Sequence, residues 1–243
     1  MWTQLPSAEI HTRVARRSEP RGPAILLVHG LGLSSRYMVP TAVELSADFD
    51  VYAPDLPGFG RSGKPDHVLD VGELAGALIA WMDALDLGRA VALGNSFGCQ
   101  VIARIAVLAP GRLERSILAG PTVDPHGRTT LRQGARLVRD VPWEPPSLLP
   151  LNLRDYLACG PGRLWETCRL ALKDAIEEAL PQMHLPTLVV RGARDPIVPQ
   201  RWAEEAVQLL PEGHLEVIPG AGHAVNYNSP ARLALLVRRF LGV

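Results

Sequence analysis

Several features that would direct this sequence to a particular class of protein are scarce or missing. It has only three cysteines, an odd number without regular spacing: Cys99, Cys159 and Cys168. We therefore expect free thiols in a reducing compartment and no disulfide framework. No CxxC or HExxH pattern indicates a metal site, and we expect neither a metal nor a cofactor. Lys plus Arg and Asp plus Glu each number 25, so no net charge favours nucleic acid or an anionic membrane as a partner.

Long apolar runs are also missing. The first 21 residues are polar, contain Pro6 and Pro20, and lack the apolar centre of a secretory signal. No uninterrupted apolar run reaches the roughly 18 residues that a bilayer-spanning helix needs. These absences favour a cytoplasmic protein that works away from membranes, as a monomer or a homodimer. With 243 residues, 47% of them hydrophobic, the chain can bury one large core.

What the sequence does contain is a series of short apolar runs that each stop at glycine or proline. Such runs are typical of strands buried on both faces of a parallel sheet. They span residues 24–28, 49–53, 90–93, 116–119, 187–190 and 215–218. Apolar residues at helical spacing predict helices between them, over residues 71–87, 99–108 and 231–240. The alternation indicates a doubly wound α/β sheet, which places its chemistry at the carboxyl ends of the strands.

Residues 122–185 break this alternation. They hold no convincing strand and two helical stretches, the second over residues 164–180, around a proline-rich joint at residues 142–150. More than 60 residues is too long for a loop alone. We predict a helical cap inserted into a core of residues 1–121 and 186–243; a longer crossover helix with a loop is the alternative.

The segment Gly94-Asn95-Ser96-Phe97-Gly98 lies between a predicted strand and a predicted helix. In this context a GxSxG pattern forms a nucleophile elbow. The serine must stand on a strained turn, and the glycines remove side chains that would collide where strand and helix cross. Ser96 is therefore the predicted nucleophile. A glycine-rich turn without chemistry is the alternative.

Two further strand ends provide an acid and a base. His223 follows the last predicted strand in Gly220-Ala-Gly-His223 and is the predicted general base. Asp195, after the strand at 187–190, is predicted to orient the imidazole. Asp124, after the strand at 116–119, is the competing acid. The chain order Ser96, Asp195, His223 is the order in which a GxSxG elbow is followed by its partners.

The segment His29-Gly30-Leu31-Gly32 ends the first predicted strand. A tetrahedral intermediate places negative charge on the former carbonyl oxygen, and two backbone N–H groups aimed at it lower the barrier. The predicted donors are the N–H groups of Leu31 and Phe97, with His29 bracing its loop. The alternative is that the glycines only form a tight turn.

The segments HGLG, DLPGFGRSGKP, GNSFG, RGARDPIVP and GAGH, in this order, resemble the α/β-hydrolase superfamily across nearly the whole chain. The chain most resembles small bacterial carboxylesterases and the carbon–carbon bond hydrolases of meta-cleavage pathways. The resemblance implies the α/β-hydrolase fold with a small helical cap after the sixth strand. Asn95 matches a residue that helps bind substrate in the carbon–carbon bond hydrolases. Those enzymes commonly carry Trp after the catalytic histidine, where this chain has Ala224.

These features predict a carboxylic-ester hydrolase (EC 3.1.1) that forms an acyl-enzyme with a small-molecule ester. The alternatives are cleavage of a carbon–carbon bond, a thioester or a lactone by the same residues, acyl transfer, and a ligand-binding receptor on the same fold. The cap is expected to line the substrate pocket. The aromatic candidates for this lining are Trp143, Tyr156 and Trp165. The aliphatic candidates are Leu148, Leu149 and Leu153.

Overall fold

The computed structural model describes residues 1–6 and 8–243. Its centre is an eight-stranded sheet in the order β1-β2-β4-β3-β5-β6-β7-β8. The strands are β1 (Trp2–Gln4), β2 (Glu9–Ala15), β3 (Ile25–Val28), β4 (Val51–Pro54), β5 (Ala90–Asn95), β6 (Leu113–Ala119), β7 (Thr187–Gly192) and β8 (Gly213–Ile218). β2 pairs antiparallel with β1 and β4, and all the other pairs are parallel. The predicted mostly parallel, doubly wound sheet is confirmed.

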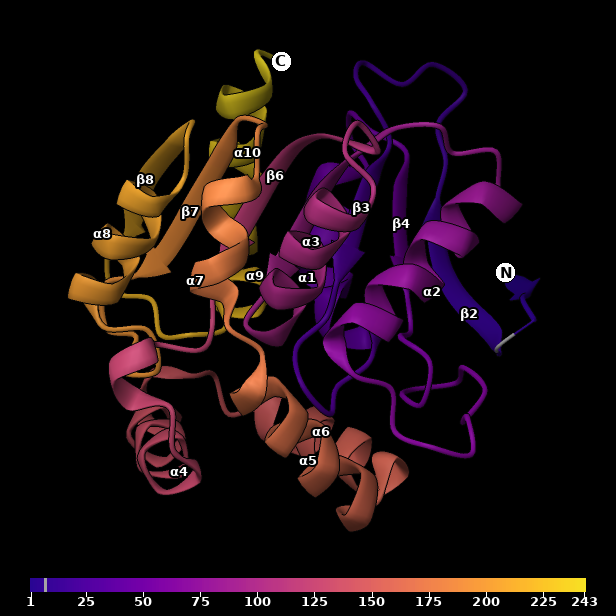
Figure 1. Ribbon diagram of the computed structural model, residues 1–243. Coiled ribbons are helices and arrows are strands. Elements are labelled where there is room, and N and C mark those ends of the chain that lie inside the picture. Colours follow the sequence, from indigo (N-terminus) through magenta and orange to yellow (C-terminus); the bar gives the residue numbers. More distant parts are fainter. Residues whose placement is uncertain (7) are drawn as a thin grey trace.

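Helices cover both faces of this sheet (Figure 1). On one face lie α2 (Val71–Ala84), α3 (Phe97–Leu108), α7 (Ile176–Ala179) and α8 (Gln200–Leu209). On the other face lie α1 (Val39–Leu45), α9 (Val225–Asn228) and α10 (Pro230–Leu241). Each face has its own hydrophobic core: the first lies under α2, α3, α7 and α8, and the second under α1, α9 and α10. Neighbouring residues of β3 point to opposite faces, so Leu26 and Val28 belong to the first core and Ile25 and Leu27 to the second. Burial on both faces explains why the strands are continuous apolar runs.

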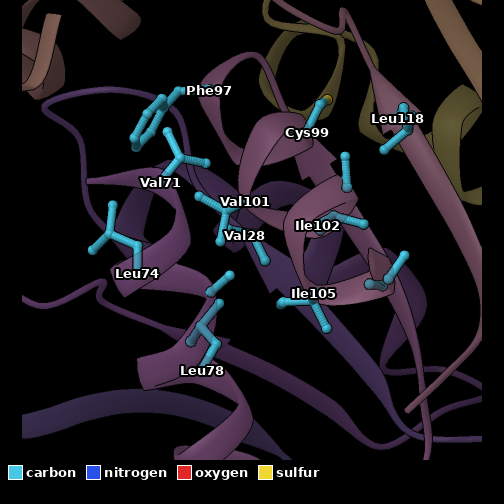
Figure 2. Packing of buried hydrophobic residues seen from close by; sticks show 14 of the residues in the cluster. Val28, Val71, Leu74, Leu78, Phe97, Cys99, Val101, Ile102, Ile105 and Leu118 are labelled. Atoms are coloured by element: carbon cyan, nitrogen blue, oxygen red, sulfur yellow. The ribbon is translucent and has the colours of Figure 1, made fainter. Parts of the chain in front are cut away.

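The pair α2 and α3 holds the predicted elbow in place. α2 begins with a capping box, in which the Asp70 carboxylate accepts from Glu73 N and the Glu73 carboxylate accepts from Asp70 N, both at 2.8 Å. Apolar side chains of α2 then pack against α3 (Figure 2). Those from α2 are Val71, Leu74 and Leu78, and those from α3 include Phe97, Val101 and Ile105. This contact fixes α3, which begins directly after Ser96.

The six predicted strands correspond to β3–β8, with ends that differ by up to three residues. β1 and β2 lie where the sequence predicts no strand. Residues 9–15 contain charged and polar side chains, and they are extended because β2 pairs with β1 on one side and β4 on the other. Pairing partners distant in the chain therefore override a weak local pattern here.

Residues 122–185, between β6 and β7, are all described and form no strand. We call this segment the insertion. Its helices are α4 (Thr130–Asp140), α5 (Leu148–Cys159), α6 (Pro161–Lys173) and α7. α4, α5 and α6 lie beyond the carboxyl ends of the strands (Figure 1). The prediction of one helical stretch over residues 164–180 is wrong. The backbone is not helical at Asp174 and Ala175, which separate α6 from α7. After this break, α7 packs in the first core beside α3.

No helix in the described part of the chain is long and apolar enough to cross a membrane.

Candidate active site

Ser96 stands on a sharp turn between β5 and α3. Its φ of 57° and ψ of −120° lie in a region that non-glycine residues rarely occupy. A Cβ atom on Gly94 would lie 2.6 Å from the carbonyl carbon of Gly98, and one on Gly98 would lie 2.3 Å from Val28 O. Glycine at both positions therefore permits the close crossing of β3, β5 and α3. The turn leaves Ser96 partly exposed at the end of the strand.

His223 and Asp195 form a buried pair at the ends of neighbouring strands. The imidazole Nδ1 lies 2.7 Å from Asp195 Oδ2. The other carboxylate oxygen accepts from Ile197 N at 2.7 Å and from Val198 N at 2.9 Å, so the carboxylate cannot rotate freely. Gly120, at the end of β6, leaves room for the ring, since a Cβ there would lie 2.9 Å from His223 Cε1.

The second ring nitrogen of His223 is free. A carboxylate only accepts, so Nδ1 carries the proton in the neutral ring and Nε2 has a lone pair. Nε2 is buried and has no hydrogen-bond partner among the described residues. Likewise, no hydrogen bond joins it to Ser96 Oγ there; such contacts often tighten only when substrate binds. An oriented imidazole with a free Nε2 can accept a proton from a hydroxyl.

The loop after β3 is fixed by the buried ring of His29. His29 Nδ1 lies 2.9 Å from Gly30 O, and His29 Nε2 accepts from Leu56 N at 3.0 Å. Burial lowers the pKa of His29 and keeps the ring neutral. The N–H groups of Leu31 and Phe97 form no hydrogen bond within the described part of the chain. Both are thus available to a ligand oxygen.

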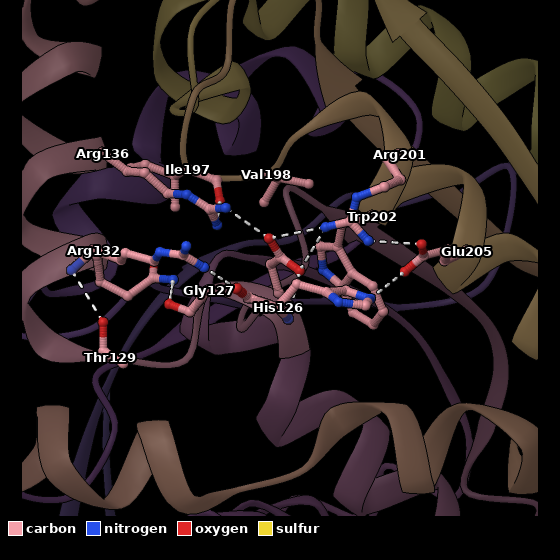
Figure 3. A network of polar contacts seen from close by, with 12 residues as sticks. His126, Gly127, Thr129, Arg132, Arg136, Ile197, Val198, Arg201, Trp202 and Glu205 are labelled. Atoms are coloured by element: carbon pink, nitrogen blue, oxygen red, sulfur yellow. Dashed lines mark hydrogen bonds and ion pairs between the residues drawn. The ribbon is translucent and has the colours of Figure 1, made fainter.

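Asp124 is occupied elsewhere. Its buried carboxylate accepts from Arg136 at 2.7 Å, from Arg201 at 3.2 Å and from His126 N at 3.0 Å. Figure 3 shows Arg136 and Arg201 entering this network of polar contacts from opposite sides. The structure therefore pairs His223 with Asp195, the acid favoured from the sequence, and places Asp124 in a separate ion-pair network.

Comparison with known proteins decides the family. A family model described as the alpha/beta hydrolase family matches residues 25–234. This chain belongs to the alpha/beta hydrolase family. The resemblance inferred from the sequence motifs is thereby confirmed.

Individual α/β hydrolases and relatives are similar over nearly the full chain. An uncharacterized protein of Mycobacterium tuberculosis is 28% identical, over 94% of this chain and 78% of that protein. An esterase from Thermogutta terrifontis has a TM-score of 0.84 and 24% identity, covering 99% of this chain and 96% of that one. A meta-cleavage product hydrolase from Pseudomonas fluorescens IP01 has a TM-score of 0.79 and 22% identity, covering 100% and 97%. At these identities the two structures show the shared fold.

The side chain of Asn95, the residue before Ser96, lies inside this α/β hydrolase. It is fully buried, and its amide nitrogen donates to Ala119 O at 3.1 Å and to His223 O at 3.2 Å. Its amide oxygen accepts from the Tyr37 hydroxyl at 2.8 Å. Every polar group of the side chain is thus used within the protein, which corrects the expectation that Asn95 binds substrate. The residue instead ties the elbow to the His223 loop.

Of the aromatic candidates in the insertion, Tyr156 alone lies beside the loop after β3. Gly32 has a φ of +73°, and a Cβ there would lie 2.9 Å from the Tyr156 ring. Burial raises the pKa of Tyr156 to about 12. Trp143 is 42% exposed and lies over the Arg194 guanidinium, 4.4 Å from the ring centroid, and Trp165 is 61% exposed. Both tryptophan side chains are therefore partly open to solvent, and their role in lining the substrate pocket stays a prediction.

The aliphatic candidates are also divided. Leu148 is buried in the second core, with the residues that pack against α1 and α10. Leu149 and Leu153 are mostly exposed. α5 thus turns one of the three leucines into the core and the other two towards solvent, and their role in lining the substrate pocket stays a prediction.

The charges around His223 favour its protonated form. Burial lowers the pKa of His223, but the carboxylates of Asp195, Asp140 and Glu144 outweigh it and raise the pKa to about 9. Asp140 and Glu144 belong to the insertion, and the sequence does not single them out. For the Asp140 carboxyl group, in contrast, burial raises the pKa, to about 7. Within the described residues, no three His, Cys, Asp or Glu side chains lie close enough to hold a metal ion.

Proposed function

We propose that this α/β hydrolase cleaves carboxylic esters through an acyl-enzyme formed on Ser96. The observation that carries the proposal is the His223–Asp195 pair. Its 2.7 Å contact orients the imidazole and leaves a buried Nε2 that has no hydrogen-bond partner in residues 1–6 and 8–243. The nucleophile elbow supports it, since the serine has the strained backbone that such an elbow needs.

In the proposed reaction, His223 Nε2 takes the Ser96 hydroxyl proton as Oγ attacks the ester carbonyl carbon. The N–H groups of Leu31 and Phe97 donate to the resulting oxyanion. The imidazolium, stabilised by Asp195, gives its proton to the departing alcohol as the carbon–oxygen bond breaks. A water molecule then loses a proton to His223 and attacks the acyl carbon. The acid leaves as Ser96 Oγ recovers the proton.

The insertion is proposed to be a cap over this site, with residues 1–121 and 186–243 as the catalytic core. The support is its position beyond the carboxyl ends of the strands and the contact of Tyr156 with Gly32. We therefore propose that Tyr156 contacts a substrate bound at the oxyanion donors. A small-molecule ester is the proposed partner.

The proposal is tested by Ser96→Ala, with Ser46→Ala, at the residue that follows α1, as the matched control. Loss of the nucleophile should lower kcat on p-nitrophenyl acetate by at least about a thousandfold and abolish labelling by a fluorophosphonate probe. Ser46→Ala should keep both. An enzyme that is labelled at another residue, or a Ser96→Ala variant that retains more than about one hundredth of kcat, would contradict the assignment.

The same assay separates the alternatives in bond type. Wild-type protein is offered p-nitrophenyl esters of increasing acyl length, a lactone, a thioester and a vinylogous 1,5-diketone. We expect the highest kcat/KM on one of the carboxylic esters. A higher value on the diketone would identify a carbon–carbon bond hydrolase, and labelling without any turnover would favour a ligand-binding receptor.

A further inference from the structure

Two carboxylates of the insertion are bonded to the loop that carries His223. Asp140, the last residue of α4, is buried, and its Oδ1 accepts from His223 N at 3.0 Å. Glu144 Oε1 accepts from Ala224 N at 2.7 Å, and Glu144 Oε2 accepts from Asn228 Nδ2 at 2.9 Å. Two consecutive N–H groups at the histidine are therefore held by the insertion and not by the sheet.

The fit between the insertion and this loop is close. A Cβ on Gly222 would lie 2.6 Å from Glu144 Oε1, 3.0 Å from Asp140 Oδ1 and 3.0 Å from Trp143 Cβ. Any side chain at position 222 would thus push the two carboxylates away. The glycine that precedes the histidine has a physical reason here, namely the approach of the insertion to the backbone.

Two residues of the core, Asn95 and Asp195, contact other atoms of His223. Asn95 Nδ2 donates to His223 O at 3.2 Å, and Asp195 Oδ2 holds the ring at Nδ1. With Asp140 on the N–H, the backbone donor, the backbone acceptor and one ring nitrogen of His223 are all bonded. Removal of the Asp140 contact leaves a buried N–H without a partner and allows the peptide to rotate.

We propose that Asp140 and Glu144 are positioning residues that hold the His223 loop so that Nε2 is presented to Ser96. This role rests on the proposed function, in which His223 is the general base. It makes the insertion part of the catalytic geometry as well as a cover for substrate. The charged groups that face His223 are Asp195 from the loop after β7, and Asp140 and Glu144 from the insertion.

The test compares Asp140→Ala and Glu144→Ala with Asp140→Asn and Glu144→Gln, which keep an acceptor oxygen and lose the charge. Glu166→Ala, which removes a partly exposed carboxylate on α6 of the same insertion, is the matched control. With p-nitrophenyl acetate, each alanine variant should lower kcat by about 10- to 100-fold with KM changed less than about threefold, because only the alignment of the base is disturbed. Each amide variant should recover to within about threefold of wild-type kcat at its own optimal pH.

A pH profile gives a readout that does not depend on the alanine variants folding. Asp140→Asn removes one negative charge beside the imidazole, so the rising limb of kcat/KM should move to lower pH, while Glu166→Ala should leave it in place. Alanine variants within twofold of wild-type kcat, a rise in KM alone, or an unmoved limb in Asp140→Asn would each overturn the positioning role.

Ser96→Ala, run beside these variants, distinguishes the two proposals. If it is inactive while the Asp140 and Glu144 variants match wild type, the positioning role alone is wrong. If Ser96→Ala retains activity, the proposed function is wrong and the positioning role falls with it.

Discussion

Asp124 and Asp195 are two buried aspartates in the same local setting. Each is followed by proline, each lies in a loop after one of two neighbouring strands, β6 and β7, and each accepts the N–H of the residue two positions later. They differ in what the other carboxylate oxygen meets. For Asp195 it is the imidazole of His223, and for Asp124 it is the guanidinium of Arg136. Local sequence sets the turn, and distant residues decide what the charge does.

The two partners give the two charges different chemical uses. A guanidinium group stays charged at ordinary pH. The ion pairs of Asp124 with Arg136 and Arg201 therefore form a fixed network that joins α4 of the insertion to α8 of the core (Figure 3). His223 exchanges its proton within the range in which enzymes work. Of these two aspartates, only Asp195 is bonded to a side chain whose charge changes during the proposed reaction.

The largest expected difference between the two aspartates is the loss of kcat when each is replaced by asparagine. Asp195→Asn should lower kcat on a short ester by about 10²- to 10⁴-fold, because an amide stabilises the wrong imidazole tautomer. Asp124→Asn should leave kcat within about threefold, since its partners are arginines. The measurement is kcat for both variants at saturating substrate, with circular dichroism to confirm folding. The reverse pattern would place the acid after β6.

A second effect is the pH dependence of the proposed base. The histidine must be neutral to accept the serine proton, and its pKa is raised to about 9 because carboxylates outweigh burial. We therefore expect kcat/KM to climb through neutral pH and level off only near pH 9. Asp124→Asn should show the same limb, as Asp124 does not face His223. A limb near the ordinary histidine pKa of about 6.5 would mean that the carboxylates do not act on the ring.

The sequence predicts the parts of this molecule that follow local rules. β3 to β8 contain apolar runs stopped by glycine or proline, and the elbow carries the short local pattern GxSxG at residues 94–98. The strand β2, which pairs with β4, and the break at Asp174 depend on pairing and packing with distant segments. They carry no local signal strong enough to predict them.

The residues of the candidate site also fall into two groups, those that the sequence predicts and those that it does not. Ser96, Asp195 and His223 each follow a strand, so parallel topology alone brings them to one edge of the sheet. Asp140 and Glu144 lie in a region without strands, and their contact with the His223 loop arises only from how the insertion docks. The glycine before His223 is the one sequence feature that hints at a close neighbour there. Asn95 shows the opposite case: the resemblance to carbon–carbon bond hydrolases implied substrate contact, while the side chain is buried and bonded within the protein.

The smallest expected effect concerns the Asp124 network. Arg136→Met should lower the free energy of unfolding by about 1–3 kcal/mol, because a buried carboxylate loses one of its charged donors while Arg201 remains. For a chain of this size that corresponds to a fall in Tm of about 2–4 °C per kcal/mol. Arg169→Met, which breaks an exposed pair within α6, should leave Tm unchanged and serves as the matched control. Neither variant should alter kcat on a short ester.

Lowering the pH should remove the difference in Tm between wild type and Arg136→Met. Burial raises the pKa of Asp124, but the Arg136 and His126 hydrogen bonds lower it below its usual range. A carboxyl group whose pKa is lower in the folded state stabilises the fold above its unfolded pKa and loses that contribution as the pH falls through the folded value. The Tm gap between wild type and Arg136→Met should therefore be largest at neutral pH and narrow once the pH falls below about 3.9, the ordinary aspartate pKa. A gap of constant size across that range would show that Arg136 stabilises the protein by packing of its aliphatic stem and not through the Asp124 charge.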